Sequence, residues 1–155
     1  EDTTPFQKEY FKDSYLFPNV VSNTTFTGGS LLSIFSGIKY GSTATSRIWH
    51  YLKEAKLMTF YISSHWIQWN NMDSFLDYPN IDYVNSSTYF TETIGRNDHL
   101  TVSIFGNTLK QKKWQKPFFG VLHFSNSHYP YTVPDNYKKW NPSEASFKRE
   151  KISSR

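Results

Sequence analysis

The sequence predicts an α/β fold in which a mostly parallel sheet is covered by helices on both faces. Two continuous apolar runs, residues 57–62 and 118–124, are typical of strands that are buried on both faces. Segments with helical periodicity alternate with these runs, as they do in layered α/β folds. The 155 residues include 13 Phe, 11 Tyr and 5 Trp, so aromatic rings can form the core of one domain.

The first two helices are predicted from their ends. Thr4 and Pro5 are an N-cap followed by a first helical residue, which opens a short helix through about residue 12. Small residues crowd the start of the segment 27–36, and Gly37 ends it. The apolar residues of this second helix share one side at helical spacing: Leu31, Leu32, Ile34 and Phe35.

The remaining elements follow from the same patterns. A third helix is expected over residues 46–55, and a fourth from Asp98, which caps it, to about residue 113. Residues 15–21 are expected to be extended, and a short strand is expected at residues 81–84. The rest of the segment 63–97 is too irregular to assign. Its aromatic part, residues 66–78, can contact a lipid or a sugar, but burial of its rings in the core explains it equally well.

Composition excludes several classes of protein. The chain contains 0 Cys, which excludes a disulfide scaffold, a cysteine nucleophile and a thiolate metal site. No apolar run reaches the roughly 20 residues that span a bilayer. The formal net charge is +4, with a basic cluster in residues 138–155 that we interpret as a solvated surface. Because no nucleic-acid-binding motif accompanies it, no nucleic-acid partner is expected.

Two loops follow predicted strands, where active sites of parallel sheets lie. The loop 22–30 runs into a helix N-terminus, which favours an anion such as phosphate or sulfate. A threonine hydroxyl there can attack a phosphoryl centre if a divalent cation or a base assists it. In the loop 125–131, His128 can donate a proton to a leaving oxygen. The alternative is structural: the hydroxyls cap a helix and the histidine is a surface residue.

The wording of these loops resembles the sulfatase/alkaline phosphatase superfamily. Residues 17–37, FPNVVSNTTFTGGSLLSIFSG, resemble its nucleophile region, an extended "F-x-N-x-x-S" run before a helix that ends in "[ST]-G". Residues 117–137, PFFGVLHFSNSHYPYTVPDNY, look like its "P-F-F…H-x-P-Y…P-x-x-Y" strand and loop. Residues 48–62 are similar to the helix–strand pair found between them. The three matches occur in the family's order and span most of residues 4–140.

The resemblance implies metal-assisted attack on a phosphate or sulfate ester with a covalent enzyme intermediate. It implies a threonine nucleophile of the phosphoethanolamine and phosphoglycerol transferase branch, also a ligand of the divalent metal. Counting back from Gly37 selects Thr25 in the transferase pattern and Thr27 in the sulfatase-like pattern, and we favour Thr25. His128 matches the loop histidine that contacts the transferred group, and Ser30 and Asn126 are assigned to substrate binding.

The sequence also departs from the family pattern. It has no "C/S-x-P-S-R" motif, no acidic residue ending an amino-terminal strand and no Asp-His-Gly, and Asp98-His99 is interpreted as a helix cap. The chain therefore resembles the amino-terminal part of a catalytic domain, 1–155, with residues 141–155 as a basic tail or the start of the next segment. Its sheet is expected to be incomplete and to expose an edge. Most metal ligands would lie outside this chain, so the fragment alone is expected to be inactive.

The resemblance implies further properties. The metal would be zinc or manganese, or calcium in a sulfatase. The substrate would be an ester of a lipid headgroup or glycan of the cell envelope. The enzyme would lie at the periplasmic or extracellular face of the cell membrane, held there by a membrane segment outside this chain. Two alternatives remain open: a sulfuric-ester hydrolase with an atypical nucleophile, and a non-catalytic relic that binds an anion or a lipid.

Overall fold

The computed structural model describes residues 5–39, 47–87, 97–111, 117–128 and 137–139. Three parallel strands form the sheet in the order β2-β1-β3. The central strand β1 (Met58–Ser63) pairs with β2 (Tyr83–Asn85) on one side and with β3 (Phe118–His123) on the other. In register, Phe60 pairs with Tyr83, and Ser63 pairs with His123. Within the described residues, β2 and β3 are the edges of the sheet.

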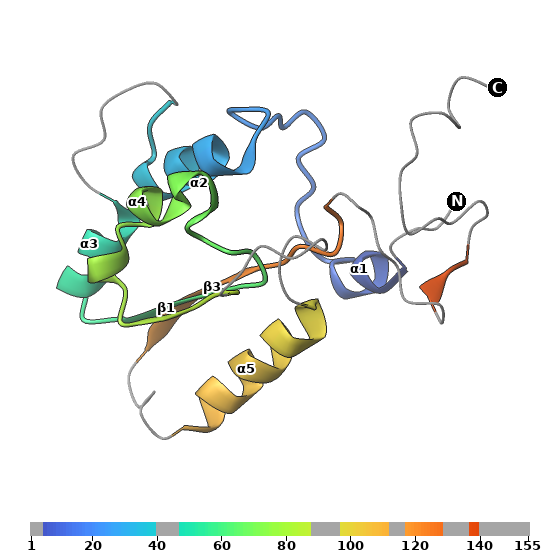
Figure 1. Cartoon of the computed structure of the whole chain (residues 1–155). Coiled ribbons are helices and arrows are strands. Elements are labelled where there is room, and N and C mark those ends of the chain that lie inside the picture. Colours follow the sequence, from blue (N-terminus) through green and yellow to red (C-terminus); the bar gives the residue numbers. More distant parts are fainter. Residues whose placement is uncertain (1–4, 40–46, 88–96, 112–116, 129–136, 140–155) are drawn as a thin grey trace, which may run out of the picture.

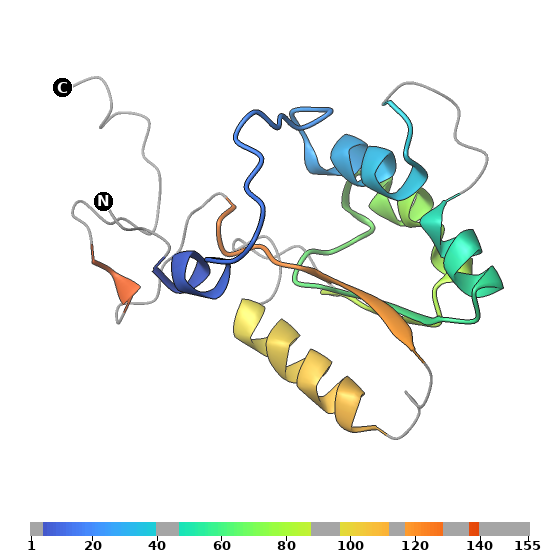
Figure 2. The same ribbon diagram turned by 180° about the vertical axis from the view of Figure 1, so that it is seen from behind.

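Helices cover both faces of the sheet, as the sequence predicts (Figures 1 and 2). The helices α2 (Thr27–Ser36), α3 (Ile48–Glu54) and α4 (Met72–Leu76) lie on one face. The helix α5 (Asp98–Lys110) lies on the other. A short helix α1 (Pro5–Tyr10) precedes this layered body and buries none of its residues.

The core lies between β1 and the three helices of the first face. It is built from the buried side chains of Phe35, Trp49, Tyr61, Ile67, Leu76 and Ile81. On the opposite face, the buried ring of Phe60 packs against Phe105 of α5 and Phe118 of β3, with centroid distances of 5.7 and 5.6 Å. Because both faces of β1 are covered, its residues from Thr59 to Ser63 are all buried, which explains the continuous apolar run in the sequence.

The helix α2 begins and ends as predicted. Gly37 follows it with a φ of 69°, and its N–H donates to the Ser33 carbonyl at 2.9 Å, so a left-handed residue closes the helix. One detail of the prediction is wrong: Ile34 is 65% exposed and does not share the buried side. Phe35, at the spacing of one helical turn from Leu31, carries the contact with the core instead.

The irregular segment after β1 contains elements that the sequence pattern did not indicate. These are two short 3-10 helices, η1 (Trp69–Asn71) and η2 (Tyr78–Asn80), on either side of α4. Asn71 and Asp77 flank α4 with φ of 57° and 55°. Left-handed residues turn the backbone sharply, so these elements are too short to show a periodicity.

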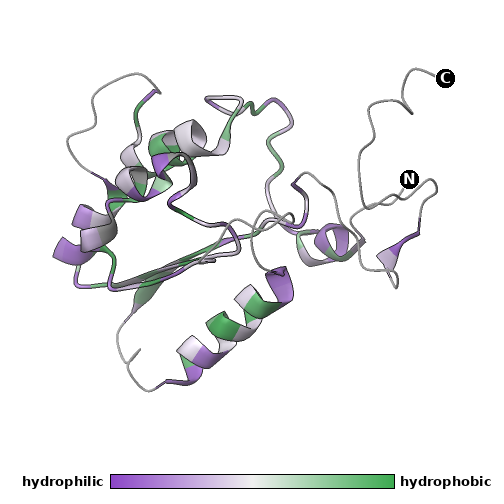
Figure 3. Ribbon diagram, in the orientation of Figure 1, coloured by the Kyte–Doolittle hydropathy of each residue, from purple (hydrophilic) through white to green (hydrophobic). Residues whose placement is uncertain are grey.

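Large apolar side chains are exposed between α1 and α2. Figure 3 shows hydrophobic residues along this segment, whose exposed members are Tyr15, Leu16, Phe17, Val20 and Val21. Among the described residues, no helix has both the length and the apolar character needed to cross a bilayer. The basic tail, residues 141–155, lies outside the described residues.

Candidate active site

The first part of the candidate site is the loop that leads into α2. Thr25 is exposed, and Thr27 is the first residue of the helix and half-buried. The N-cap position is held by Phe26, whose side chain cannot accept a hydrogen bond from the first helical N–H groups. The two candidate threonines are therefore different: Thr25 presents its hydroxyl from the loop, whereas Thr27 belongs to the first turn.

The loop is held together by hydroxyl groups. The Ser30 Oγ lies 2.7 Å from the Ser22 Oγ and 3.0 Å from the Thr24 Oγ1. Thr24 Oγ1 also donates to the Phe26 carbonyl at 2.8 Å. A Cβ on Gly29 would lie only 2.9 Å from Thr24 and from the Phe26 ring, so the close packing of the loop requires glycine there. Ser30, assigned to substrate binding from the sequence, thus also fixes the shape of the loop that carries Thr25.

The second part is a cluster of three histidines at the carboxyl end of the sheet. His123 is the last residue of β3, His65 follows the end of β1, and His128 lies on the turn after β3. The rings of His65 and His123 stack with centroids 4.4 Å apart. The His128 ring meets the His65 ring edge-on at 5.7 Å. Parallel pairing of β1 with β3 brings these three residues together from distant parts of the sequence.

His123 is a neutral residue of this cluster. Burial and the neighbouring His65 lower its pKa to about 4. Its Nδ1 lies 2.8 Å from the Tyr61 hydroxyl and 3.2 Å from the Ser63 Oγ. Burial also raises the pKa of Tyr61, so the phenol keeps its proton beside Nδ1.

His65 lies between the other two rings. Burial and the positive charge of a protonated His128 lower its pKa, while a hydrogen bond to the Phe124 carbonyl and the Asp98 carboxylate oppose the shift. Its own backbone is fixed on two sides. The His65 N–H donates to the Ser63 Oγ at 3.0 Å, and its carbonyl accepts the Ser87 N–H at 3.2 Å. The backbone of His65 is thus held at the strand end by the last residue of β1 and by a residue that follows β2.

Asp98 connects the two strand ends below the histidines. One carboxylate oxygen accepts the Ser64 hydroxyl at 2.5 Å and the Ser125 N–H at 2.9 Å, and the other accepts the Asn126 N–H at 2.9 Å. The Ser125 carbonyl then accepts the His128 N–H at 2.8 Å, which closes the turn that carries His128. The N-cap of α5 is Asn97 and not Asp98, which corrects the expectation from the sequence. Asp98 instead orders the loop of His128.

The structure does not join the two parts of the predicted site. The N-terminus of α2 and the carboxyl ends of the strands face the same side of the molecule (Figures 1 and 2). Within the described part of the chain, however, no hydrogen bond connects Thr25 with the histidine cluster. Asn126, the other predicted substrate-binding residue, has an exposed side chain beside His128 and a backbone fixed by Asp98.

The sequence analysis missed His65 and His123, and it missed the hydrogen bonds of Asp98 to the loops that follow β1 and β3. His65 follows a predicted strand directly, so the rule that selected the loop of His128 could also have selected it. His123 lies inside an apolar strand and has no comparable signal. The partners of Asp98 lie 27 to 34 positions away, beyond any local pattern.

The described residues do not by themselves form a metal site. None of their histidine, aspartate and glutamate side chains gather in a group of three or more that could hold an ion. Thr25 by itself offers one hydroxyl oxygen, whereas divalent cations in proteins take several oxygen or nitrogen ligands. The donor set present in this part of the chain therefore does not fit a complete cation site.

The family model described as Sulfatase matches residues 1–153. The chain belongs to the sulfatase family. Members of its superfamily are hydrolases and phosphotransferases of phosphate and sulfate esters. The match confirms the resemblance to this family that the sequence motifs indicated. Among curated proteins, none matches this chain.

Two solved structures show the same fold. One is the C-terminal periplasmic domain of EcEptC from Escherichia coli in complex with Zn, with a TM-score of 0.68 and 16% identity over 98% of this chain and 46% of that chain. The other is a protein in the alkaline phosphatase superfamily from Vibrio parahaemolyticus, with a TM-score of 0.54 and 22% identity over 82% of this chain and 31% of that chain. The sulfatase-family chain thus spans less than half the length of these two neighbours.

Proposed function

We propose that this chain is part of a metal-dependent enzyme that transfers or hydrolyses a phosphate ester through a threonine nucleophile. The match of the sulfatase family model over residues 1–153 is the observation that carries the proposal. Two features support it. Thr25 is exposed on a loop that enters a helix N-terminus, and His128 lies on an ordered turn at the carboxyl end of the sheet.

In the proposed reaction, the Thr25 oxygen attacks the phosphorus of the ester. The bond from Oγ1 to phosphorus forms, the bond from phosphorus to the leaving oxygen breaks, and the hydroxyl proton passes to solvent. His128 donates a proton to the leaving oxygen and becomes neutral. An acceptor hydroxyl or water then attacks the phosphorus of the phosphothreonine and gives its proton to His128. The bond from phosphorus to Oγ1 breaks, and Oγ1 takes up a proton from solvent, which restores the Thr25 hydroxyl. The pKa values of His65 and His123 are both lowered, chiefly by burial, which favours the neutral form of the two rings next to His128.

The unassisted threonine hydroxyl is far too weak a nucleophile for this step. A divalent cation supplies the Lewis acidity that activates it when bound. We propose zinc or manganese, with Thr25 as one ligand and most of the other ligands outside this chain. The domain of EcEptC whose structure is similar was crystallised with Zn, which supports this choice. It is also a periplasmic domain, which supports a periplasmic location and a lipid headgroup or glycan of the cell envelope as substrate.

The test compares Thr25→Ala with Thr27→Ala in the complete catalytic domain, supplied with zinc or manganese. The substrates are bis(p-nitrophenyl) phosphate and p-nitrophenyl sulfate. We expect Thr25→Ala to lower phosphodiester turnover by roughly 10³-fold or more, and Thr27→Ala to lower it much less. Intact-mass analysis after a brief reaction should find a phosphoryl adduct that Thr25→Ala lacks. His128→Ala should lower turnover by roughly 10²–10⁴-fold.

The alternatives make different predictions in the same experiment. A sulfuric-ester hydrolase would act on the aryl sulfate and not on the phosphodiester. A greater loss in Thr27→Ala would transfer the nucleophile to Thr27. If a metal-loaded complete domain acts on neither ester, the enzyme proposal fails and the anion- or lipid-binding relic becomes the better account.

A further inference from the structure

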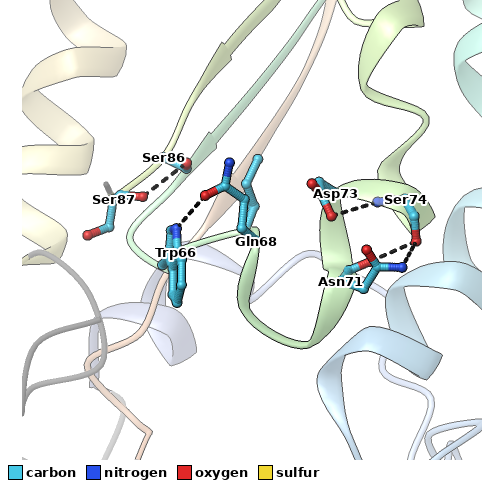
Figure 4. A pocket seen from close by; sticks show the side chains of 8 residues that line it. Trp66, Gln68, Asn71, Asp73, Ser74, Ser86 and Ser87 are labelled. Atoms are coloured by element: carbon cyan, nitrogen blue, oxygen red, sulfur yellow. Dashed lines mark hydrogen bonds between the residues drawn. The ribbon is translucent and has the colours of Figure 1, made fainter. Parts of the chain in front are cut away.

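A cavity of about 520 Å³ with a mixed polar and apolar lining lies beside the histidine cluster. Its walls come from the loop after β1, from the start of α4 and from the residues after β2 (Figure 4). Trp66, which lines it, directly follows His65 in the chain, and Ser87, which also lines it, donates its N–H to the His65 carbonyl. The volume is in the range of small-molecule sites. The cavity therefore adjoins the candidate active site.

One wall offers an indole and a hydrogen-bond donor. The Trp66 Nε1–H donates to the Gln68 Oε1 at 2.9 Å. An indole N–H only donates, so the amide oxygen of Gln68 must face the tryptophan. The amide NH₂ of Gln68 then remains for another partner, and no hydrogen bond among the described residues uses it. Figure 4 shows Trp66 and Gln68 on one side of the cavity and Asp73 on the other.

The opposite wall offers two acceptors. The Ser74 hydroxyl donates to the Asn71 carbonyl at 2.8 Å, so its oxygen accepts the Asn71 Nδ2 at 2.9 Å and the Asn71 Oδ1 is left over. The Ser74 N–H binds the Asp73 Oδ1 at 3.0 Å, which leaves the Asp73 Oδ2. No hydrogen bond among the described residues uses either remaining oxygen. The Asp73 N–H donates to the Ile67 carbonyl at 2.9 Å, which fixes this wall against the other.

These groups discriminate between classes of ligand. None of the described residues that line the cavity is a lysine, arginine or histidine, and Asp73 repels an anion, so a phosphate does not fit. An ammonium group only donates hydrogen bonds, so it could not accept one from the Gln68 NH₂. A hydroxyl group both donates and accepts, so it can bind Gln68 on one side and Asp73 or Asn71 on the other. The indole adds an apolar surface for the C–H face of a ring.

We propose that this cavity binds a saccharide ring through Trp66, Gln68, Asn71 and Asp73. Binding of the sugar does not depend on the chemistry at Thr25. That the sugar carries the acceptor hydroxyl or the ester of the reaction rests on the proposed function, because the cavity adjoins His65. For the aromatic segment 66–78, the sequence left open a lipid, a sugar or burial in the core, and the proposal assigns Trp66 of that segment to a sugar.

The test is binding of simple glycosides, measured without turnover in the complete catalytic domain. The probes are methyl α-D-glucopyranoside, methyl α-D-mannopyranoside and methyl β-D-galactopyranoside, with ethanolamine and inorganic phosphate as comparison ligands. Side-chain ¹⁵N–¹H NMR spectra report on the Trp66 indole, assigned by its loss in Trp66→Phe. We expect at least one glycoside to shift this resonance saturably, with a Kd in the millimolar range.

Gln68→Glu is the decisive variant. It keeps an oxygen for the Trp66 N–H but replaces the donor NH₂ by an acceptor, so it should weaken glycoside binding about tenfold. Asp73→Asn, which keeps the bond to the Ser74 N–H, should weaken it by a similar factor. Trp69→Phe is the matched control, because Trp69 is an exposed tryptophan of the same loop outside the cavity lining, and it should bind as the wild type does.

Other outcomes overturn the proposal. Tighter binding of ethanolamine, strengthened by Gln68→Glu, would identify an amine site. Phosphate shifting the Trp66 resonance would identify an anion site, and no saturable shift with any glycoside would leave the cavity without a ligand of this class. Thr25→Ala should not change glycoside binding. Glycoside binding without ester turnover would refute the proposed function and leave the sugar site standing.

Discussion

Acidification should destabilise the protein through His123 in particular. This histidine is neutral in the folded state because burial and the ring of His65 lower its pKa from 6.5 to about 4. The unfolded chain therefore binds one more proton than the folded chain in this interval, so stability is present above about pH 6.5 and is lost as the pH falls to about 4. At about 1.4 kcal/mol for each tenfold change, the loss is about 3 kcal/mol.

The assay is urea unfolding at pH 7, 5.5 and 4, compared between the wild type and His123→Gln. The variant removes the titrating group and keeps an amide that can accept the Tyr61 hydroxyl, so its own stability at pH 7 sets the reference. Between pH 7 and 4 the wild type should lose about 3 kcal/mol more than the variant. His99→Gln is the control, since His99 is exposed at the start of α5, and its curve should parallel that of the wild type.

All three proteins contain the same carboxylates. The contribution of these groups to the pH dependence therefore cancels when the stability changes of the proteins are subtracted from one another. The two causes that lower the pKa of His65 are its own burial and His128, and both remain in the variant, so protonation of His65 is still opposed. If the pH dependence of His123→Gln parallels that of the wild type, His123 titrates normally in the folded state. The account of a neutral, buried histidine pair would then be wrong.

Two other substitutions test the fold around the site by urea unfolding. Asp98→Ala removes three hydrogen bonds to a carboxylate and should lower the free energy of unfolding by about 3 kcal/mol. Asn97→Ala removes the N-cap of the same helix and should lower it by only about 1 kcal/mol. Equal losses would mean that Asp98 stabilises α5 alone. Gly120→Ala places a Cβ 1.8 Å from the Phe60 Cζ and should lower the free energy of unfolding by about 3 kcal/mol. In the control Gly106→Ala, in α5, the new Cβ meets nothing within 4 Å, and the variant should be more stable by roughly 0.5–1 kcal/mol. A tolerated Gly120→Ala would show that the Phe60 ring can move aside.

The layered sheet can be predicted from the sequence because short, local patterns of residues indicate its strands and helices. Residues 57–62 are almost all apolar because β1 is covered on both faces, whereas the residues of β3 are half-buried or exposed, so the expectation of burial on both faces holds for β1 and not for β3. The bounds of α2 are visible because Gly37 closes it with a left-handed turn. The segment containing α4 gives no such pattern. Its ends depend on left-handed Asn71 and Asp77, which the surrounding packing stabilises and local propensity does not indicate.

The candidate site is less predictable because its contacts are long-range. The position of His128 after a strand follows from the sequence, and so does the exposed Thr25 before α2. The stacking of His65 on His123 depends on the pairing of strands that lie about 60 residues apart, as the Tyr61–His123 hydrogen bond also shows. Asp98 has the sequence context of a cap, and only the fold reveals that its carboxylate holds two loops.

The carboxyl edge of the sheet thus separates two kinds of surface within a short stretch of chain. At His65 and His123, burial lowers the pKa and so favours the neutral form of both rings. One residue further along the chain, Trp66 begins a wall without positive charge that faces the carboxylate of Asp73. An ester of a sugar has the same division, with a charged centre bonded to a neutral, hydroxyl-bearing ring. A phosphoryl group beside His128 and a saccharide in the cavity would each meet the electrostatic environment that suits it, and exchanging the two would place the anion beside Asp73.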